Sequence, residues 1–204
     1  MNSLNLTCVI LDAARIFGEI DTAQKLQSKF LSLYKEQNEE LLSSVAPHLF
    51  QYQSGTEFSE WLLEKGWGNA WGVFVISKVG LEDLQNHFRK FLMVKTEDGK
   101  ELFFRFYDPR VLRIFLPTCN ESQLEEFFGP VESYLLEDDD PSKAIRFKLV
   151  NKKLHKEYFL KEDFLKLVNS QSGEVKPLSP SQSLSGNQKN EKPNTGKGWS
   201  FMVD

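Results

Sequence analysis

The sequence predicts an α/β or α+β fold in which a mixed β-sheet is flanked by helices. Short β-rich apolar runs alternate along the chain with segments whose apolar residues recur at helical spacing. Of the 26 aromatic residues among 204, 16 lie between Phe50 and Phe128, which places the main core there. We expect an N-terminal lobe over residues 1–130, a smaller C-terminal subdomain over 131–170 and a disordered tail over 171–204.

Apolar runs and capping residues predict the first elements. The run over 4–11 indicates a buried strand that ends at Asp12. Asp21 and Gln24 have the spacing of a capping box and predict a helix over 22–36. Further on we expect a strand over 49–52, a helix that Thr56 caps and Gly66 ends in a left-handed conformation, and a strand over 71–76.

Turn and cap signals also divide the second half. An apolar stripe predicts a helix over 81–92, and Asp98-Gly99 predicts a hairpin between strands at 93–95 and 102–107. Asp108-Pro109 is typical of a helix start, and Asn120 with Gln123 forms another capping box. The remaining expectations are a helix stop at Gly129-Pro130, strands over 131–136 and 144–150, an exposed acidic turn over 137–140 and a helix over 161–168.

Composition narrows the class of protein. With 25 basic and 29 acidic residues the net charge is −4, which argues against a nucleic-acid binder. No basic leader or membrane-length apolar run is present, so we expect a cytoplasmic protein. Of the 28 residues over 171–198, 19 are Gly, Pro, Ser, Thr, Asn or Gln, a composition that predicts disorder. The apolar end, 199–204, is either a short docking motif or merely a sticky end.

No catalytic or cofactor motif stands out. A strained nucleophile turn and the glycine-rich loops that hold phosphates are both missing, and the two cysteines and three histidines have no metal-ligand spacing. We therefore predict no cofactor, no metal and no catalytic residue. The best enzyme-like pair is Asp12 with Asp108, each after a predicted strand, which could hold a cation. The plainer interpretation is that Asp108 caps a helix and Asp12 pairs with Arg15 or another arginine.

The candidate binding residues are Trp67, Trp71, Arg105, Tyr107 and Arg110. Strand alternation would put Arg105 between the rings of Phe103 and Tyr107. Arg110, in the first turn of a helix, needs a compensating carboxylate, for which Asp12 is the obvious candidate.

Two interpretations of these residues stay open. Asp12, Arg15, Asp108 and Pro109 could form a structural network with the arginines, or the arginines could present a fork to a partner's carboxylate or carbonyls. The two tryptophans could be lids on the core or anchors for a bound chain.

At these residues the sequence resembles the adaptor/chaperone family of bacterial type VI secretion, over about residues 5–130. The matching pieces are Ile10-Leu11-Asp12-Ala13-Ala14-Arg15, Val45-Ala46-Pro47-His48-Leu49, Trp61-Leu62 with Gly66-Trp67-Gly68 and Trp71-Gly72, Leu84 through His87 to Arg89-Lys90-Phe91-Leu92, Phe104-Arg105-Phe106-Tyr107-Asp108-Pro109-Arg110-Val111-Leu112, Phe115-Leu116-Pro117-Thr118, and Phe127-Phe128-Gly129-Pro130.

The resemblance implies a non-enzymatic loader. Such a protein binds the N-terminal segment of a cognate toxic effector and helps to mount it on the VgrG spike protein, without nucleic acid or membrane as a partner. Two other functions stay open beside the loader. One is a metal-dependent hydrolase that uses Asp12 and Asp108, and the other is an immunity protein that neutralises a toxin.

Overall fold

The computed structural model describes residues 5–16, 18–34, 45–95, 98–169, 177–178 and 200–201. Apart from 177–178 and 200–201, the tail expected to be disordered lies outside the described residues. The apolar end is described only at Ser200 and Phe201.

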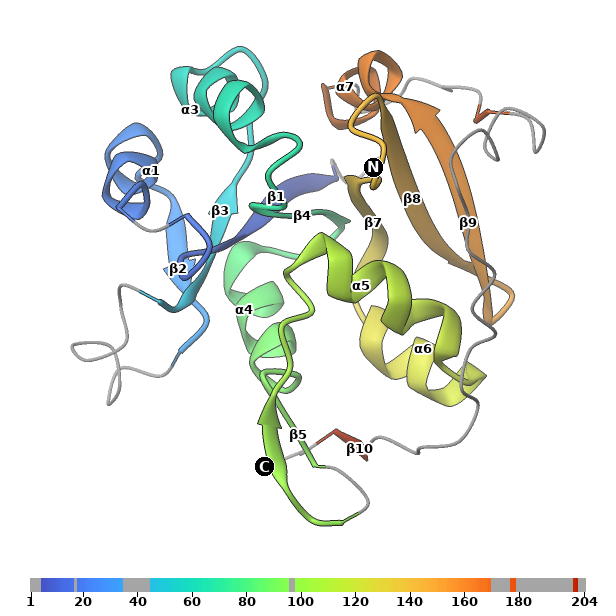
Figure 1. Cartoon of the computed structure of the whole chain (residues 1–204). Coiled ribbons are helices and arrows are strands. Elements are labelled where there is room, and N and C mark those ends of the chain that lie inside the picture. Colours follow the sequence, from blue (N-terminus) through green and yellow to red (C-terminus); the bar gives the residue numbers. More distant parts are fainter. Residues whose placement is uncertain are drawn as a thin grey trace.

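A seven-stranded sheet runs through the middle of the molecule (Figure 1). Its strand order is β2-β3-β1-β4-β7-β8-β9, and every described pairing is antiparallel. The α+β class is thus confirmed, but the expectation of a mixed sheet is wrong, because neighbouring strands here run in opposite directions. The strands are β1 (Leu6–Asp12), β2 (Phe30–Ser32), β3 (Pro47–Gln51), β4 (Gly72–Ser77), β7 (Val131–Glu137), β8 (Lys143–Val150) and β9 (Lys153–Leu160).

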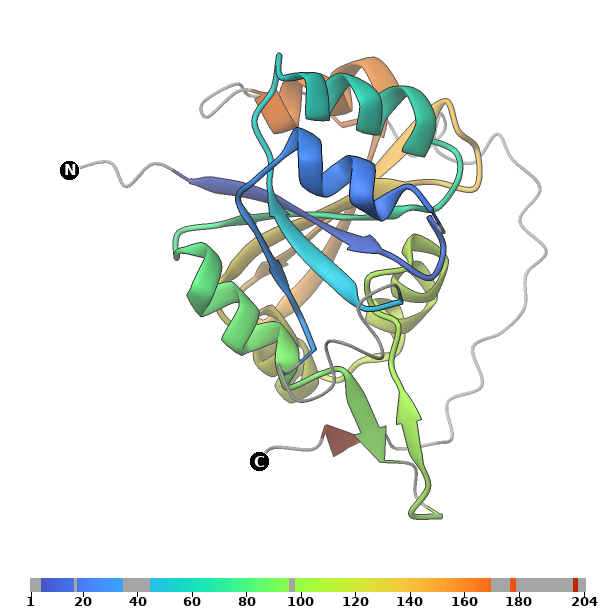
Figure 2. The same ribbon diagram turned by 90° about the vertical axis from the view of Figure 1, so that its left-hand side faces the viewer.

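Helices cover both faces of this sheet. On one face lie α1 (Ile20–Leu26), α3 (Glu57–Trp61) and α7 (Lys161–Asn169), and on the other lie α4 (Leu81–Arg89), α5 (Pro109–Phe115) and α6 (Glu121–Phe128). Figure 2 shows the resulting three layers edge-on. Short π and 3-10 segments, η2 (Leu62–Gly66) and η3 (Leu116–Thr118), follow α3 and α5. Among the described residues, none of these helices has the length and apolar character needed to cross a membrane.

Alternating residues of β1 supply the two cores. Cys8 and Ile10 face the cluster under α4, α5 and α6, while Val9 and Leu11 face the cluster under α1, α3 and α7. This alternation follows from the pleat of a strand. β1 is therefore buried on both sides, as its continuous apolar run predicts.

A second, smaller sheet projects from the body. It consists of β5 (Met93–Lys95), β6 (Glu101–Phe103) and the C-terminal β10 (Ser200–Phe201), in the order β10-β5-β6. The hairpin predicted around Asp98-Gly99 is confirmed, with Gly99 at a φ of 81°. Its second strand ends at Phe103, however, and not at Tyr107, because the chain turns there towards α5.

The helix predicted over 22–36 is wrong for the described residues 27–34, and its last two residues lie outside the described part of the chain. Residues Phe30–Ser32 form β2, which pairs with β3 so that Phe30 lies opposite Phe50. Pairing with a distant strand thus overrides the local helical spacing. The expected capping box of Asp21 is absent too, since α1 has Glu19 at its N-cap without a side-chain hydrogen bond.

Other local signals are confirmed. Thr56 caps α3 through a hydroxyl that accepts from the Ser59 N–H at 3.2 Å, and Asn120 accepts from the Gln123 N–H at 2.9 Å. Gly129 ends α6 with a φ of 44°. The strands over 131–160 continue the large sheet through the β4–β7 pairing, so residue 131 marks no break in that sheet.

Candidate functional site

The sequence-predicted residues gather where β1 ends and α5 begins. Asp12, the last residue of β1, is buried, and its N–H donates to the Trp71 carbonyl at 3.0 Å. The chain then turns, and the Arg15 Nε donates to the Asn69 carbonyl at 3.0 Å. The end of β1 is thereby joined to the loop that enters β4.

Asp12 forms an ion pair with Arg105, which lies 93 positions further along the chain. Both the Nε of Arg105, at 3.1 Å, and its terminal nitrogen donate to Oδ2 of Asp12. Oδ1 of Asp12 is buried and has no hydrogen-bond partner among the described residues. The hydrogen bond to Asp12 is the main cause that raises the pKa of Arg105, whose side chain is 42% exposed.

A second carboxylate–arginine pair begins α5. The Oδ1 of Asp108 accepts from the N–H and the Nε of Arg110, both at 3.0 Å, and Oδ2 accepts from its terminal nitrogen at 2.6 Å. Asp108 is therefore the predicted N-cap, with Pro109 as the first helical residue. Burial of Asp108 opposes its ionisation, but the bonds from the side chain and backbone of Arg110 lower its pKa.

Two details of the predicted network are wrong. Arg110 forms its ion pair with Asp108, two positions earlier, and Asp12 acts on it only electrostatically. Arg105 lies beyond the end of β6 and pairs with Asp12, so it does not stand between the rings of two strand neighbours. Tyr107 is buried, and that burial, followed by the nearby Tyr34 and Asp12, raises its pKa.

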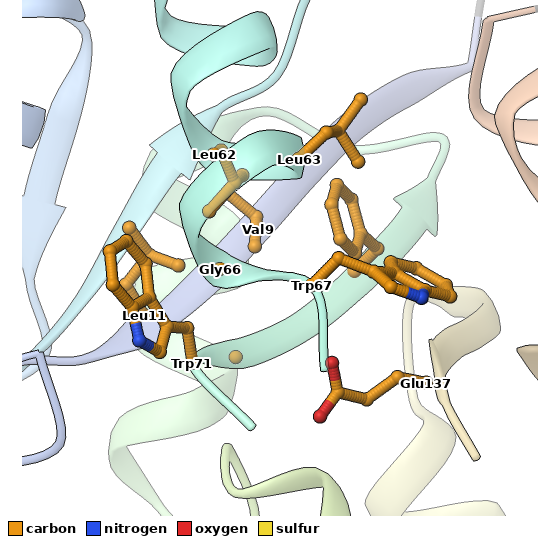
Figure 3. Close-up of a pocket in the computed structure, with 10 residues that line it drawn as sticks. Val9, Leu11, Leu62, Leu63, Gly66, Trp67, Trp71 and Glu137 are labelled. Atoms are coloured by element: carbon orange, nitrogen blue, oxygen red, sulfur yellow. The ribbon is translucent and has the colours of Figure 1, made fainter. Parts of the chain in front are cut away.

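The segment over residues 67–71, called the tryptophan loop, connects η2 to β4. Its backbone is bound by Glu137, at the end of β7. The two oxygens of its carboxylate accept from the N–H groups of Gly68 and Ala70, each at 2.6 Å. Figure 3 shows Glu137 together with Trp67 and Trp71. Gly68 and Ala70 both have a positive φ, 85° and 54°, which turns their amides towards the carboxylate. Burial raises the pKa of Glu137, and these two hydrogen bonds oppose that rise.

Glu137 shows what sequence reasoning missed. It was expected in an exposed acidic turn, but it is buried as the last residue of β7. The only sequence signal is that it directly follows the apolar pair Leu135-Leu136. Gly66 is also corrected: it is not a left-handed cap, and a Cβ there would lie 2.9 Å from the ring of Trp71.

The two tryptophans have separate partners within the fold. The indole of Trp67 donates to the Pro141 carbonyl at 2.7 Å and packs 4.6 Å from Phe164, whereas Trp71 packs 5.3 Å from Trp61. Between them a pocket of about 20 Å³, lined by Leu62, Gly66 and Glu137, has room for roughly one water molecule. Both tryptophans are half-buried and pack against the core under α1, α3 and α7.

Five side chains that are exposed or half-buried belong to the two ion pairs or lie next to them. We define the exposed strip as Tyr34, Phe103, Arg105, Arg110 and Ile114. The rings of Tyr34 and Phe103 are 6.2 Å apart, Arg105 acts electrostatically on Tyr34, and both arginines act on Asp108. Arg110 and Ile114 lie four residues apart on α5 and so share a face.

The ends of the exposed strip are unusually apolar for a surface. Phe103 is 63% exposed and Ile114 is 73% exposed, the two most exposed of the large hydrophobic side chains in the described part of the chain. The side chains of Arg105 and Arg110 are 42% and 49% exposed. The strip therefore has two guanidinium groups between its two apolar ends. Such an arrangement can receive an extended or helical segment that carries both acidic and apolar groups.

Asp12 and Asp108, the residues of the alternative cation site, both face arginine side chains. Asp108 uses both oxygens and Asp12 uses one in bonds to arginine. Within the described segments, no group of three or more His, Cys, Asp or Glu side chains is arranged to hold a metal ion.

Comparison with protein families gives one finding. A family model described as a domain of unknown function, DUF4123, matches residues 9–126, which is more than half of the chain. The match spans the end of β1, the tryptophan loop, both ion pairs and all members of the exposed strip. The comparisons with curated proteins and with solved structures gave no match.

Proposed function

Because the chain belongs to the DUF4123 domain family, which is known in type VI secretion effector-associated proteins, we propose that it is an adaptor that carries an effector. In this proposal it binds the N-terminal segment of a cognate toxic effector and helps to load that effector onto the VgrG spike. The adaptor makes and breaks no covalent bond.

The observation that carries the proposal is the exposed strip. Phe103 and Ile114 are 63% and 73% exposed, and apolar side chains that stand with aromatic and arginine side chains on one surface are typical of protein-binding patches. Arginine is enriched at such surfaces because its planar fork still has free donors after one ion pair has formed.

The ion pairs and the tryptophan loop support this surface from below. Asp12 and Asp108 are buried and fix the two guanidinium groups at their inner ends. Arg113 donates to the Glu137 carbonyl at 2.7 Å and so ties α5 to β7. A rigid surface loses less conformational entropy on binding than a mobile one, which suits a protein that must hold its client until delivery. The proposal assigns Trp67, Trp71 and Tyr107 to this support.

The test compares matched surface variants in binding to a purified effector and a purified VgrG protein from the same host. Phe103→Asp and Ile114→Asp each place a charge at one end of the exposed strip and should weaken effector binding about tenfold or more. Val150→Asp is the control, because Val150 is also an exposed apolar residue, 42% exposed, in the β8–β9 hairpin. All three variants should keep the melting temperature of the parent protein.

The proposal fails if neither the effector nor VgrG binds the parent protein at low salt. It also fails if Val150→Asp weakens effector binding as much as the two strip variants do. An immunity protein would differ in the cell, because co-expression would then abolish the toxicity of its partner.

A further inference from the structure

The outer edge of β5 is occupied by the far end of the same chain. β10 pairs antiparallel with β5, with Ser200 opposite Lys95 and Phe201 opposite Val94. Figures 1 and 2 both show β10 beside the projecting hairpin, far from the end of α7. The pairing therefore joins two segments that are separated by more than 100 positions in the sequence.

The register shows which backbone groups of β5 face β10. The Phe104 N–H donates to the Leu92 carbonyl at 2.9 Å, so these directly opposite residues form a hydrogen-bonded pair. Such pairs alternate along an antiparallel ladder, so Val94 faces β6 in the same way. Lys95, the next residue, turns its N–H and C=O to the other side, where Ser200 lies.

This edge needs a ligand for physical reasons. A strand edge with free N–H and C=O groups is a template for any extended chain, and proteins cover such edges. The side chain of Val94 is buried and anchors β5 to the body, so the outward N–H and C=O of the exposed Lys95 are held in place for a partner strand. The two residues of β10 make a short ladder, but the covalent connection to α7 raises the local concentration of this segment and favours the contact.

We infer that the outer edge of β5 is a binding site for an extended peptide, and that residues Ser200–Phe201 of the same chain are its ligand. The site recognises backbone groups, chiefly through the pair Lys95 and Ser200. An extended segment of another protein reaches this edge only by displacing β10. This is peptide recognition by strand addition, in which main-chain hydrogen bonds supply the affinity.

The site also bears on the exposed strip. β6, on the other side of β5, carries Phe103, so the covering of β5 braces the hairpin that presents this ring. This last consequence rests on the proposed function. The binding of β10 to β5 does not depend on the proposed function. The experiment below measures that pairing directly, so a negative result there is distinguishable from a failure of effector binding.

The first measurement is amide hydrogen exchange, resolved by residue, on the full chain and on a chain that lacks residues 199–204. Loss of the segment should speed exchange at Lys95 by about tenfold or more, because its N–H loses its acceptor. Val94, whose N–H faces β6, is the internal control for the fold and should not change. Ser200→Pro in the full chain removes the N–H that donates to the Lys95 carbonyl, so the two-residue ladder is weakened and exchange at Lys95 should again become faster. Unchanged exchange at Lys95 in both variants would overturn the inference.

The second measurement returns the segment as a free peptide, residues 198–204, to the shortened chain. The peptide should restore slow exchange at Lys95, and it should do so equally well when the Phe201 nitrogen is methylated, because that N–H points away from β5. Methylation of the Ser200 nitrogen should abolish the effect. Equal behaviour of the two methylated peptides would contradict the register. Slow exchange that requires a dimer of the full chain would identify a second copy as the ligand and overturn the assignment within one chain.

Discussion

The two carboxylate–arginine pairs at the site are similar in chemistry, but their partners are separated by very different distances along the sequence. Asp108 and Arg110 are two positions apart, and three hydrogen bonds satisfy both oxygens of the carboxylate. Asp12 and Arg105 are 93 positions apart, and both donors of the arginine converge on one oxygen. The first pair organises a single helix start, whereas the second joins the central strand to the segment after the β5–β6 hairpin.

Because of this difference, we expect loss of the short-range pair to affect mainly the start of α5, and loss of the long-range pair to lower the stability of the whole fold. If Asp108 loses its partner, it still caps α5 through the Arg110 N–H. If Asp12 loses its partner, a buried carboxylate is left with no side-chain donor that the described residues supply. The long-range pair is therefore where the fold is most sensitive, and substitutions at the two pairs measure the contrast.

Arg105→Ala should have the largest effect. Removing one member of a buried pair costs roughly 3 kcal/mol in the free energy of unfolding, the lower end of the usual range because Arg105 is 42% exposed. Urea unfolding measures this value. In the double variant Asp12→Leu with Arg105→Leu, much of the loss should be recovered, because no buried charge remains. A loss below about 1 kcal/mol in the single variant would show that the two pairs are equivalent.

Asp108→Ala should have an intermediate effect of about 1–2 kcal/mol, because α5 loses its N-cap and Arg110 loses its acceptor. Asp108→Asn is the matched control, since the amide oxygen still caps the helix while the negative charge is gone. Urea unfolding of the two variants should therefore place Asn between Ala and the parent protein. If Asn and Ala were equally destabilising, the charge and not the cap would dominate.

Arg110→Ala should have the smallest effect, about 0.5 kcal/mol near neutral pH, because the side chain is half exposed and Asp108 keeps its backbone donor. Arg110 holds the pKa of Asp108 below its ordinary value. The stability from this pair is therefore fully present above the pKa of the unfolded chain and is lost as the pH falls through the lower, folded value. Melting temperatures of parent and variant should differ at about pH 6 and converge by about pH 2. A gap that widens in acid would contradict this sign.

The sequence predicts features whose cause lies within a few residues. The N-caps Thr56, Asp108 and Asn120 are predicted correctly because donor and acceptor are neighbours in the chain, although the similar signal at Asp21 fails. The buried run of β1 is equally local, since the four successive apolar residues Cys8-Val9-Ile10-Leu11 carry the signal.

Features that depend on distant segments escape this reasoning. Nothing near Asp12 indicates Arg105, and nothing near Phe30 indicates that β3 will pair with it. Glu137 has the same difficulty, because the acceptor role of its carboxylate is set by two amides that lie 67 and 69 positions earlier. The structure brings both carboxylates and both arginines together, but which carboxylate pairs with which arginine depends on contacts across the fold that sequence spacing does not carry.

The seam between β4 and β7 has a practical consequence for how this chain is divided. The family match ends at residue 126, just before β7, yet Phe74 and Val75 of β4 pair with Leu135 and Tyr134 of β7. A fragment that ends at Phe128 would leave the edge of β4 unpaired and would expose the apolar surface that Tyr134 now covers. Unpaired strand edges promote self-association. The stretch that the family model covers thus ends before the sheet to which it contributes is complete.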